Sequence, residues 1–126
     1  MKKLTAESVM KADEDFEAAH ELAGARRRLH DGVCFHCQQC AEKYLKALLE
    51  EQGLTVPKTH NLVSLLPLLK PSFPGIGSLR RGTDFLTRFS VDTRYPGHRA
   101  TKRQAGSSLR WAQRVRDTVR PLLGLK

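Results

Sequence analysis

The chain has 126 residues, of which 40% are hydrophobic and 28% charged, and its formal net charge at pH 7 is +9. This length supports a single domain, residues 1–126, around one modest core. No stretch approaches the roughly 18 uninterrupted apolar residues of a membrane-spanning helix, and the N-terminus lacks the apolar segment of a signal peptide. We therefore expect a cytoplasmic protein with reduced cysteines and no membrane contact.

The hydrophobic pattern is helical over almost the whole chain. In residues 9–23 apolar side chains recur every three or four positions, which predicts a long first helix that Arg26–Arg28 close at its negative dipole end. A second long helix is predicted over residues 33–52. Its end is placed there because Gly53 is a typical residue just beyond a helix C-terminus.

Two shorter helices and a third long one follow. The short helices are predicted over residues 62–69 and 78–89, and Asn61 or Thr59 would cap the first of them. Residues 90–100 are polar and turn-rich, and the last long helix begins near Thr101. Since no alternation typical of a strand occurs, the sequence predicts an all-α fold, an up-and-down helical bundle of three long and two short helices.

All three cysteines lie in the stretch CFHCQQC, residues 34–40. Each three-residue step along a helix rises about 4.5 Å, which leaves the outer two thiols roughly 9 Å apart. The sulfur ligands of one zinc ion lie within about 4 Å of each other, so a straight helix cannot bring all three to one metal. We therefore expect Cys34 and Cys37 to line a buried helix face as small hydrophobic side chains, with no metal and no cofactor.

A neighbouring stripe of the same helix contains His36, Cys40 and Lys43. His36 and Lys43 could support a ligand site or face a second subunit, or they could lie at a half-buried edge. Phe35 points away from the Cys34 face, which suggests that another element or another subunit also covers that side of the helix.

Three motifs carry a family resemblance: FHCQQCAEKYLKALLEEQG, PKTHNLVSLL and FSVDTRYPG. Together they resemble the prokaryotic HEPN domain family, in which alanines commonly stand at the positions of Cys37 and Cys40. The resemblance implies a compact helical bundle, often a homodimer, related to the substrate-binding subunits that accompany small nucleotidyltransferases.

The resemblance also raises the question of catalysis. Some HEPN proteins are metal-independent RNases that act as toxins, with an arginine and a histidine at the last helix of each dimer subunit and four to six residues between them. Here three residues separate Arg94 from His98, one fewer than in that pattern, and the pair lies in a Pro-Gly turn. If RNA is cleaved, His98 would take the proton of the 2′-hydroxyl group and Arg94 would stabilise the phosphate charge.

The charge distribution points to a polyanionic partner. Residues 90–126 hold nine lysines and arginines against two acidic residues. Four of these cations and one neighbouring tyrosine, at and after the turn, are candidates to bind a phosphate or nucleotide: Arg94, Tyr95, Arg99, Lys102 and Arg103. Asp92 could orient a site residue. Alternatively, Arg94 pairs with Asp92 and His98 is simply an exposed turn residue.

Three functions fit these observations. The first is a non-enzymatic dimer that binds a nucleotide or RNA and acts with a separately encoded nucleotidyltransferase-like protein. The second is a metal-independent endoribonuclease toxin of a toxin–antitoxin pair. The third is a structural or assembly subunit without a ligand, held together through the Phe35 side of the second helix.

Overall fold

The protein is a bundle of three long helices with two short ones on one side, as predicted. The computed structural model describes residues 1–91 and 95–126. The long helices are α1 (Lys3–Ala23), α2 (His30–Glu51) and α5 (Lys102–Leu122), and the short ones are α3 (Leu66–Leu69) and α4 (Arg80–Thr87). Single 3-10 segments flank the short helices: Leu62–Leu65, Pro74–Leu79 and Arg88–Ser90. No strand occurs among the described residues.

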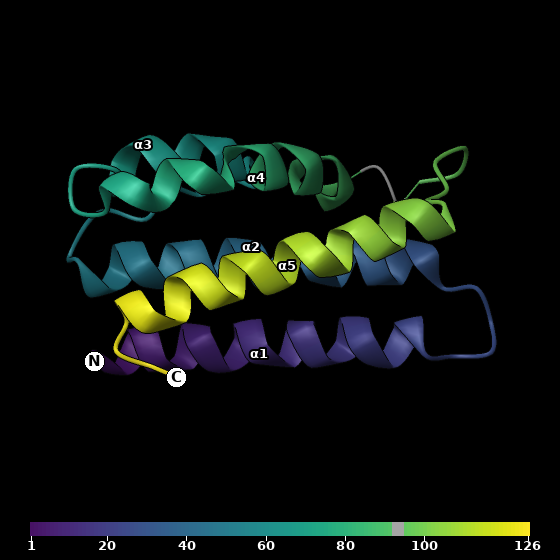
Figure 1. Ribbon diagram of the computed structural model, residues 1–126, viewed down its shortest axis with the longest axis horizontal. Coiled ribbons are helices and arrows are strands. Elements are labelled where there is room, and N and C mark those ends of the chain that lie inside the picture. The colour runs from purple at the N-terminus through teal and green to yellow at the C-terminus, as the bar shows by residue number, and fades with distance from the viewer. Residues whose placement is uncertain (92–94) are drawn as a thin grey trace.

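The helix α2 is the centre of the bundle. Figure 1 shows α1 along one side of α2, α3 and α4 along the opposite side, and α5 crossing in front of α2 between them. Because neighbours cover α2 on several sides, twelve of its 22 residues are buried, including Tyr44 and Leu45, which are fully buried. The helix α5 contributes a narrower apolar stripe that includes Ala112, Val115 and Val119. Among the described residues, no helix combines the length and apolar character needed to cross a membrane.

The three cysteines belong to this core. Cys34, Cys37 and Cys40 are free thiols with no exposed surface. Burial raises the pKa of all three thiols above the usual value of 9.0, because a thiolate would lose its hydration there. The prediction that the cysteines act as small buried side chains is confirmed.

Two predicted helix boundaries are wrong. The helix α1 ends at Ala23 and Gly24 caps it, donating its N–H to the carbonyl of His20 at 3.1 Å. Glycine is a poor helix former and a favourable residue at helix ends, so the helix stops before the arginines. Arg26–Arg28 therefore lie exposed in the connection to α2, and α2 begins at His30, three residues earlier than predicted.

Of the two caps predicted for the short segment after α2, Asn61 is the one that the structure has, and Thr59 supports Asn61. The side chain of Asn61 accepts the N–H of Val63 at 3.1 Å, and the hydroxyl of Thr59 accepts the N–H of Asn61 at 3.1 Å. At the other predicted start, Thr101 caps α5 by accepting the N–H of Gln104, whose side chain accepts the N–H of Thr101 in return.

Candidate functional site

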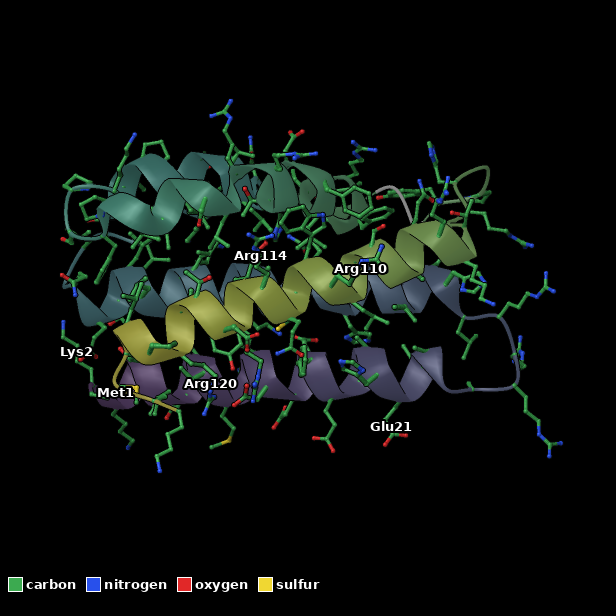
Figure 2. All side chains as sticks on the ribbon, in the orientation of Figure 1. Met1, Lys2, Glu21, Arg110, Arg114 and Arg120 are labelled. Atoms are coloured by element: carbon green, nitrogen blue, oxygen red, sulfur yellow. The ribbon has the colours of Figure 1, made fainter. Side chains whose placement is uncertain are left out.

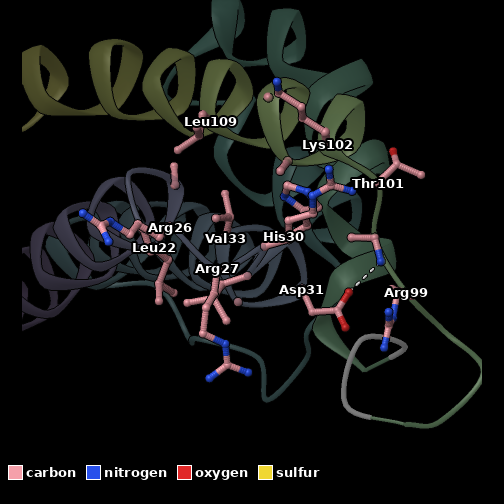
Figure 3. Close-up of a pocket in the computed structure, with 18 residues that line it drawn as sticks. Leu22, Arg26, Arg27, His30, Asp31, Val33, Arg99, Thr101, Lys102 and Leu109 are labelled. Atoms are coloured by element: carbon pink, nitrogen blue, oxygen red, sulfur yellow. Dashed lines mark hydrogen bonds between the residues drawn. The ribbon is translucent and has the colours of Figure 1, made fainter.

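A basic cleft of about 1090 Å³ opens at one end of the bundle, where α1 ends and where α2 and α5 begin. Figure 3 shows the residues that line it. Its cationic and potentially cationic side chains come from three places in the chain. Arg26, Arg27 and Arg28 come from the connection after α1, His30 is the first residue of α2, and Arg99 and Lys102 lie just before and at the start of α5. Leu22, Val33 and Leu109 add apolar surface to the same cleft.

The topology of the bundle explains why cations gather at this end. The helices α2 and α5 run in the same direction, so both N-termini, and with them the positive ends of both helix dipoles, face the cleft (Figure 1). Leu29, at the N-cap position of α2, makes no side-chain cap hydrogen bond, whereas Thr101 caps α5. This arrangement favours a bound anion at the cleft.

An aspartate links the two sides of the cleft. The Oδ1 atom of Asp31 accepts the backbone N–H of Ala100 at 2.6 Å, between residues 69 positions apart in the sequence. Asp31 lies in the first turn of α2, and Ala100 directly precedes the N-cap residue of α5. The dashed line in Figure 3 marks this bond.

A second, smaller hollow of about 260 Å³ adjoins the cleft. Arg88, His98 and Gln104 contribute to its lining, and Arg99 lines both cavities. His98 is exposed to solvent, so its ring is open to a ligand. The hollow therefore places an imidazole beside two guanidinium groups.

The structure brings together only part of the predicted site. Arg99 and Lys102 line the basic cleft, and His98 lines the smaller hollow. Arg103 and Tyr95 are exposed and line neither cavity, with 57% of the surface of Tyr95 accessible. Asp92 and Arg94 lie outside the described residues.

The other half of the cleft comes from the end of α1 and the start of α2. Arg26–Arg28, His30 and Asp31 were not predicted as site residues, although the three adjacent arginines after Gly24 carried a signal. A run of like charges next to a glycine is typical of a loop rather than of a helix end. Such a loop is a common place for a binding residue.

His36 and Lys43 lie elsewhere, at the contact between α1 and α2. Both bind the carboxylate of Asp15, which is 8% exposed: the Nδ1 atom of His36 lies 2.7 Å from Oδ1, and the ammonium group of Lys43 contacts Oδ2. Neither side chain lines the cleft or the smaller hollow. Their position is explained by a buried carboxylate that needs partners.

Two further polar clusters stabilise the bundle, one between α1, α2 and α5 and one between α2 and the connector that follows it. Arg116 and Arg120 of α5 bind Asp13 of α1, and Arg120 also donates to the hydroxyl of the buried Tyr44 at 3.2 Å. Figure 2 shows Arg120 between α5 and α1. These two arginines of the basic C-terminal region are therefore engaged inside the bundle and not available to a ligand.

The other cluster surrounds Glu42 on α2. Its carboxylate is bound by Gln38 at 3.0 Å, by the Nδ1 atom of His60 at 2.9 Å and by Lys46 at 3.2 Å. Burial by itself raises the pKa of Glu42, but the hydrogen bonds from Gln38 and His60 and the charge of Lys46 outweigh it, so the net pKa is lowered. His60 thus fixes the connector after α2.

Comparisons with known proteins agree with this fold. The crystal structure of TT1696 from Thermus thermophilus is similar at 26% identity and a TM-score of 0.81, over 94% of this chain and 97% of that one. The crystal structure of ST0689, an archaeal HEPN homologue, is similar at 26% identity and a TM-score of 0.75, over 97% of this chain and 98% of that one. No curated protein matches the chain significantly.

The family assignment rests on the sequence itself as well as on the fold. The HEPN domain model matches residues 5–122, which includes all five helices except the first two residues of α1. The motifs that carried the resemblance lie within this match. A family match over nearly the whole chain, on a bundle shared with two solved structures, shows that this protein belongs to the HEPN domain family.

Proposed function

We propose that this HEPN protein is a non-enzymatic binding module that holds a nucleotide or RNA by its phosphates in the basic cleft. One observation carries the proposal: Arg26–Arg28 and the pair Arg99 and Lys102, which are far apart in the sequence, line one cavity. Guanidinium and ammonium groups are the side chains that proteins use to bind phosphate.

The state of these cations supports the proposal. Among the described residues, no acidic side chain forms an ion pair with Arg26, Arg27, Arg28, Arg99 or Lys102. By contrast, Arg116 and Arg120 are paired with Asp13. The cations of the cleft therefore keep their charge available for a phosphate, and the apolar surface of Leu22, Val33 and Leu109 can contact a base or ribose.

The proposal includes the expected partners. The protein acts as a homodimer, and a separately encoded nucleotidyltransferase-like protein provides the chemistry for the ligand it holds. Family membership supports this part, because the resemblance connects the chain to the substrate-binding subunits of small nucleotidyltransferases.

The test is a binding measurement with two probes in separate arms: a fluorescein-labelled single-stranded oligouridylate, and ATP. We expect the double variant Arg99→Ala/Lys102→Ala to bind at least one probe about tenfold or more weakly, since each lost charged hydrogen bond costs about 1.5–3 kcal/mol. The control, Lys58→Ala/Lys70→Ala, removes the same charge from two exposed positions outside both cavities.

The two double variants separate the possible outcomes. An equal loss in both would show an effect of net charge alone and would refute a site at the cleft. Absence of binding in both arms would also refute the proposal and would favour an assembly subunit without a ligand. Binding of ATP but not of the oligouridylate would identify a nucleotide site, and the reverse result an RNA site.

A second candidate function is metal-independent RNA cleavage, because exposed His98 lies with Arg88 and Arg99 around the smaller hollow. A neutral imidazole can remove the proton of a 2′-hydroxyl group, and a guanidinium can stabilise the phosphate. The test is cleavage of RNA in EDTA by the wild type and by His98→Ala, with His20→Ala as a control for an exposed histidine of α1. Cleavage that survives in His98→Ala would exclude this mechanism.

A further inference from the structure

Asp31 is an unusual side chain to find in a cleft built to hold an anion. Among the described residues that line the cleft, Asp31 is the acidic one, and the charged or titratable groups around it are Arg26–Arg28, His30, Arg99 and Lys102. Its negative charge opposes the binding of an anion. Asp31 therefore contributes something to the cleft other than attraction for the ligand.

The hydrogen bond from Ala100 provides part of the answer. Ala100 is 6% exposed, so its N–H is shielded from water. If the Asp31 side chain were removed and the backbone stayed in place, this N–H would have no hydrogen-bond partner. Because Ala100 lies between Arg99 and the α5 N-cap Thr101, the bond to Asp31 fixes the backbone on which the Arg99 side chain is mounted. A ligand cannot easily replace Asp31 at this N–H, since the atom is buried.

The remaining part is electrostatic. The repulsion between a fixed carboxylate and a bound anion grows in proportion to the charge of the anion. It also falls as salt screens the partly exposed charges. Asp31 thus weakens the binding of strongly charged anions more than that of weakly charged ones.

We propose that Asp31 is a positioning residue that also sets the charge selectivity of the cleft: its hydrogen bond to Ala100 holds Arg99 in place, and its charge disfavours polyphosphates relative to single phosphates. This inference rests on the proposed function, since it concerns the same cleft. It assigns to Asp31 two effects of opposite sign on affinity.

Two substitutions separate the two effects. Asp31→Asn keeps a carbonyl oxygen at the place of Oδ1 and removes the charge, whereas Asp31→Ala removes both. Comparison of Asp31→Asn with the wild type therefore measures the charge, and comparison of Asp31→Ala with Asp31→Asn measures the hydrogen bond at constant charge. Asp84→Asn is the matched control, because Asp84 is exposed on α4 and lines neither cavity.

The experiment is calorimetric titration of the full chain with inorganic phosphate and with tripolyphosphate at low and at high salt. We expect Asp31→Asn to bind tripolyphosphate about fivefold more tightly than the wild type at low salt, with about a twofold gain for phosphate and smaller gains at high salt. We expect Asp31→Ala to bind both probes about tenfold more weakly than Asp31→Asn. If Asp31→Ala does not fold, Asp31→Ser, whose hydroxyl is too short to reach the same position, replaces it.

Two results would overturn the inference: equal affinities of Asp31→Asn and Asp31→Ala, or a gain in Asp31→Asn no larger than that in Asp84→Asn. If either result appears while Arg99→Ala/Lys102→Ala still loses binding, the proposed function stands and the role of Asp31 alone is rejected. If the wild type binds no probe and no nucleotide or RNA, the proposed function is the part that fails.

Discussion

The contact between α4 and α5 allows a sharp prediction about a single methyl group. Gly82 lies buried in α4 directly beneath the indole ring of Trp111 on α5. A Cβ atom at position 82 would lie 2.6 Å from Cδ2 and 3.0 Å from Cζ3 of Trp111, and closer still to Cε3. The perturbation is Gly82→Ala, which adds only this atom.

The expected change in stability follows from two opposing effects. Alanine favours a helix interior over glycine by about 1 kcal/mol. The indole is a rigid ring, so contacts this short can be relieved only if the whole ring or α4 shifts. Overpacking of this kind costs about 1–3 kcal/mol. Because the contact involves several ring atoms, the upper value applies, and we expect Gly82→Ala to lose about 2 kcal/mol in unfolding free energy.

Gly106 on α5 is the matched control. A Cβ atom there would meet only a terminal nitrogen of Arg110, at 3.6 Å, an ordinary contact with a flexible group. Gly106→Ala should therefore gain about 0.5–1 kcal/mol from helix propensity alone. The assay is urea unfolding followed by circular dichroism, and the two variants should shift the midpoint in opposite directions with unchanged slope.

A second comparison tests the cause. In a Trp111→Ala background the obstructing ring is absent, so Gly82→Ala should become neutral or stabilising. The reasoning would be refuted if Gly82→Ala were as stable as Gly106→Ala, or if its cost persisted without the indole.

Three further predictions concern the buried polar groups and thiols. Since the pKa of Glu42 is lowered in the folded protein from the usual value of 4.5, its ionised form stabilises the fold above pH 4.5, and this stabilisation is lost as the pH falls from there through the lowered pKa. Glu42→Gln should therefore lose about 2 kcal/mol of unfolding free energy at pH 7, and the deficit should shrink over that same pH range, as measured by urea unfolding at each pH. A pH-independent deficit would contradict this. The three cysteines should not react with Ellman's reagent in the native protein and should all react in guanidinium, because they have no exposed surface; fast labelling of any thiol without denaturant would argue against the core. Burial and the hydrogen bond to Asp13 raise the pKa of Tyr44 to about 12. Tyr44→Phe should lower the unfolding free energy by about 1–2 kcal/mol, because Asp13 and Arg120 lose a shared partner. An unchanged urea midpoint would show that the hydroxyl contributes no net stability.

The sequence by itself was sufficient for the type and order of the helices and for the role of the cysteines. Apolar residues at three- and four-residue spacing determine which face of a helix is buried, and this information is local. The rise of a helix likewise excluded a single metal ion at Cys34, Cys37 and Cys40. The start of α5 was predictable because Thr101 and Gln104 form their capping interactions within one turn.

The tertiary structure alone decided the composition of the cleft. Arg99 and Lys102 were predicted from the basic C-terminal region, but their meeting with Arg26–Arg28 and with Asp31 depends on how the helix ends assemble. The same holds for His36 and Lys43, which bind Asp15 of α1 and not the cleft. Helical periodicity indicates which side of a segment is buried. A site at the end of a bundle depends instead on the lengths of the helices and on the loops between them. No local sequence pattern indicates which of these loops become neighbours.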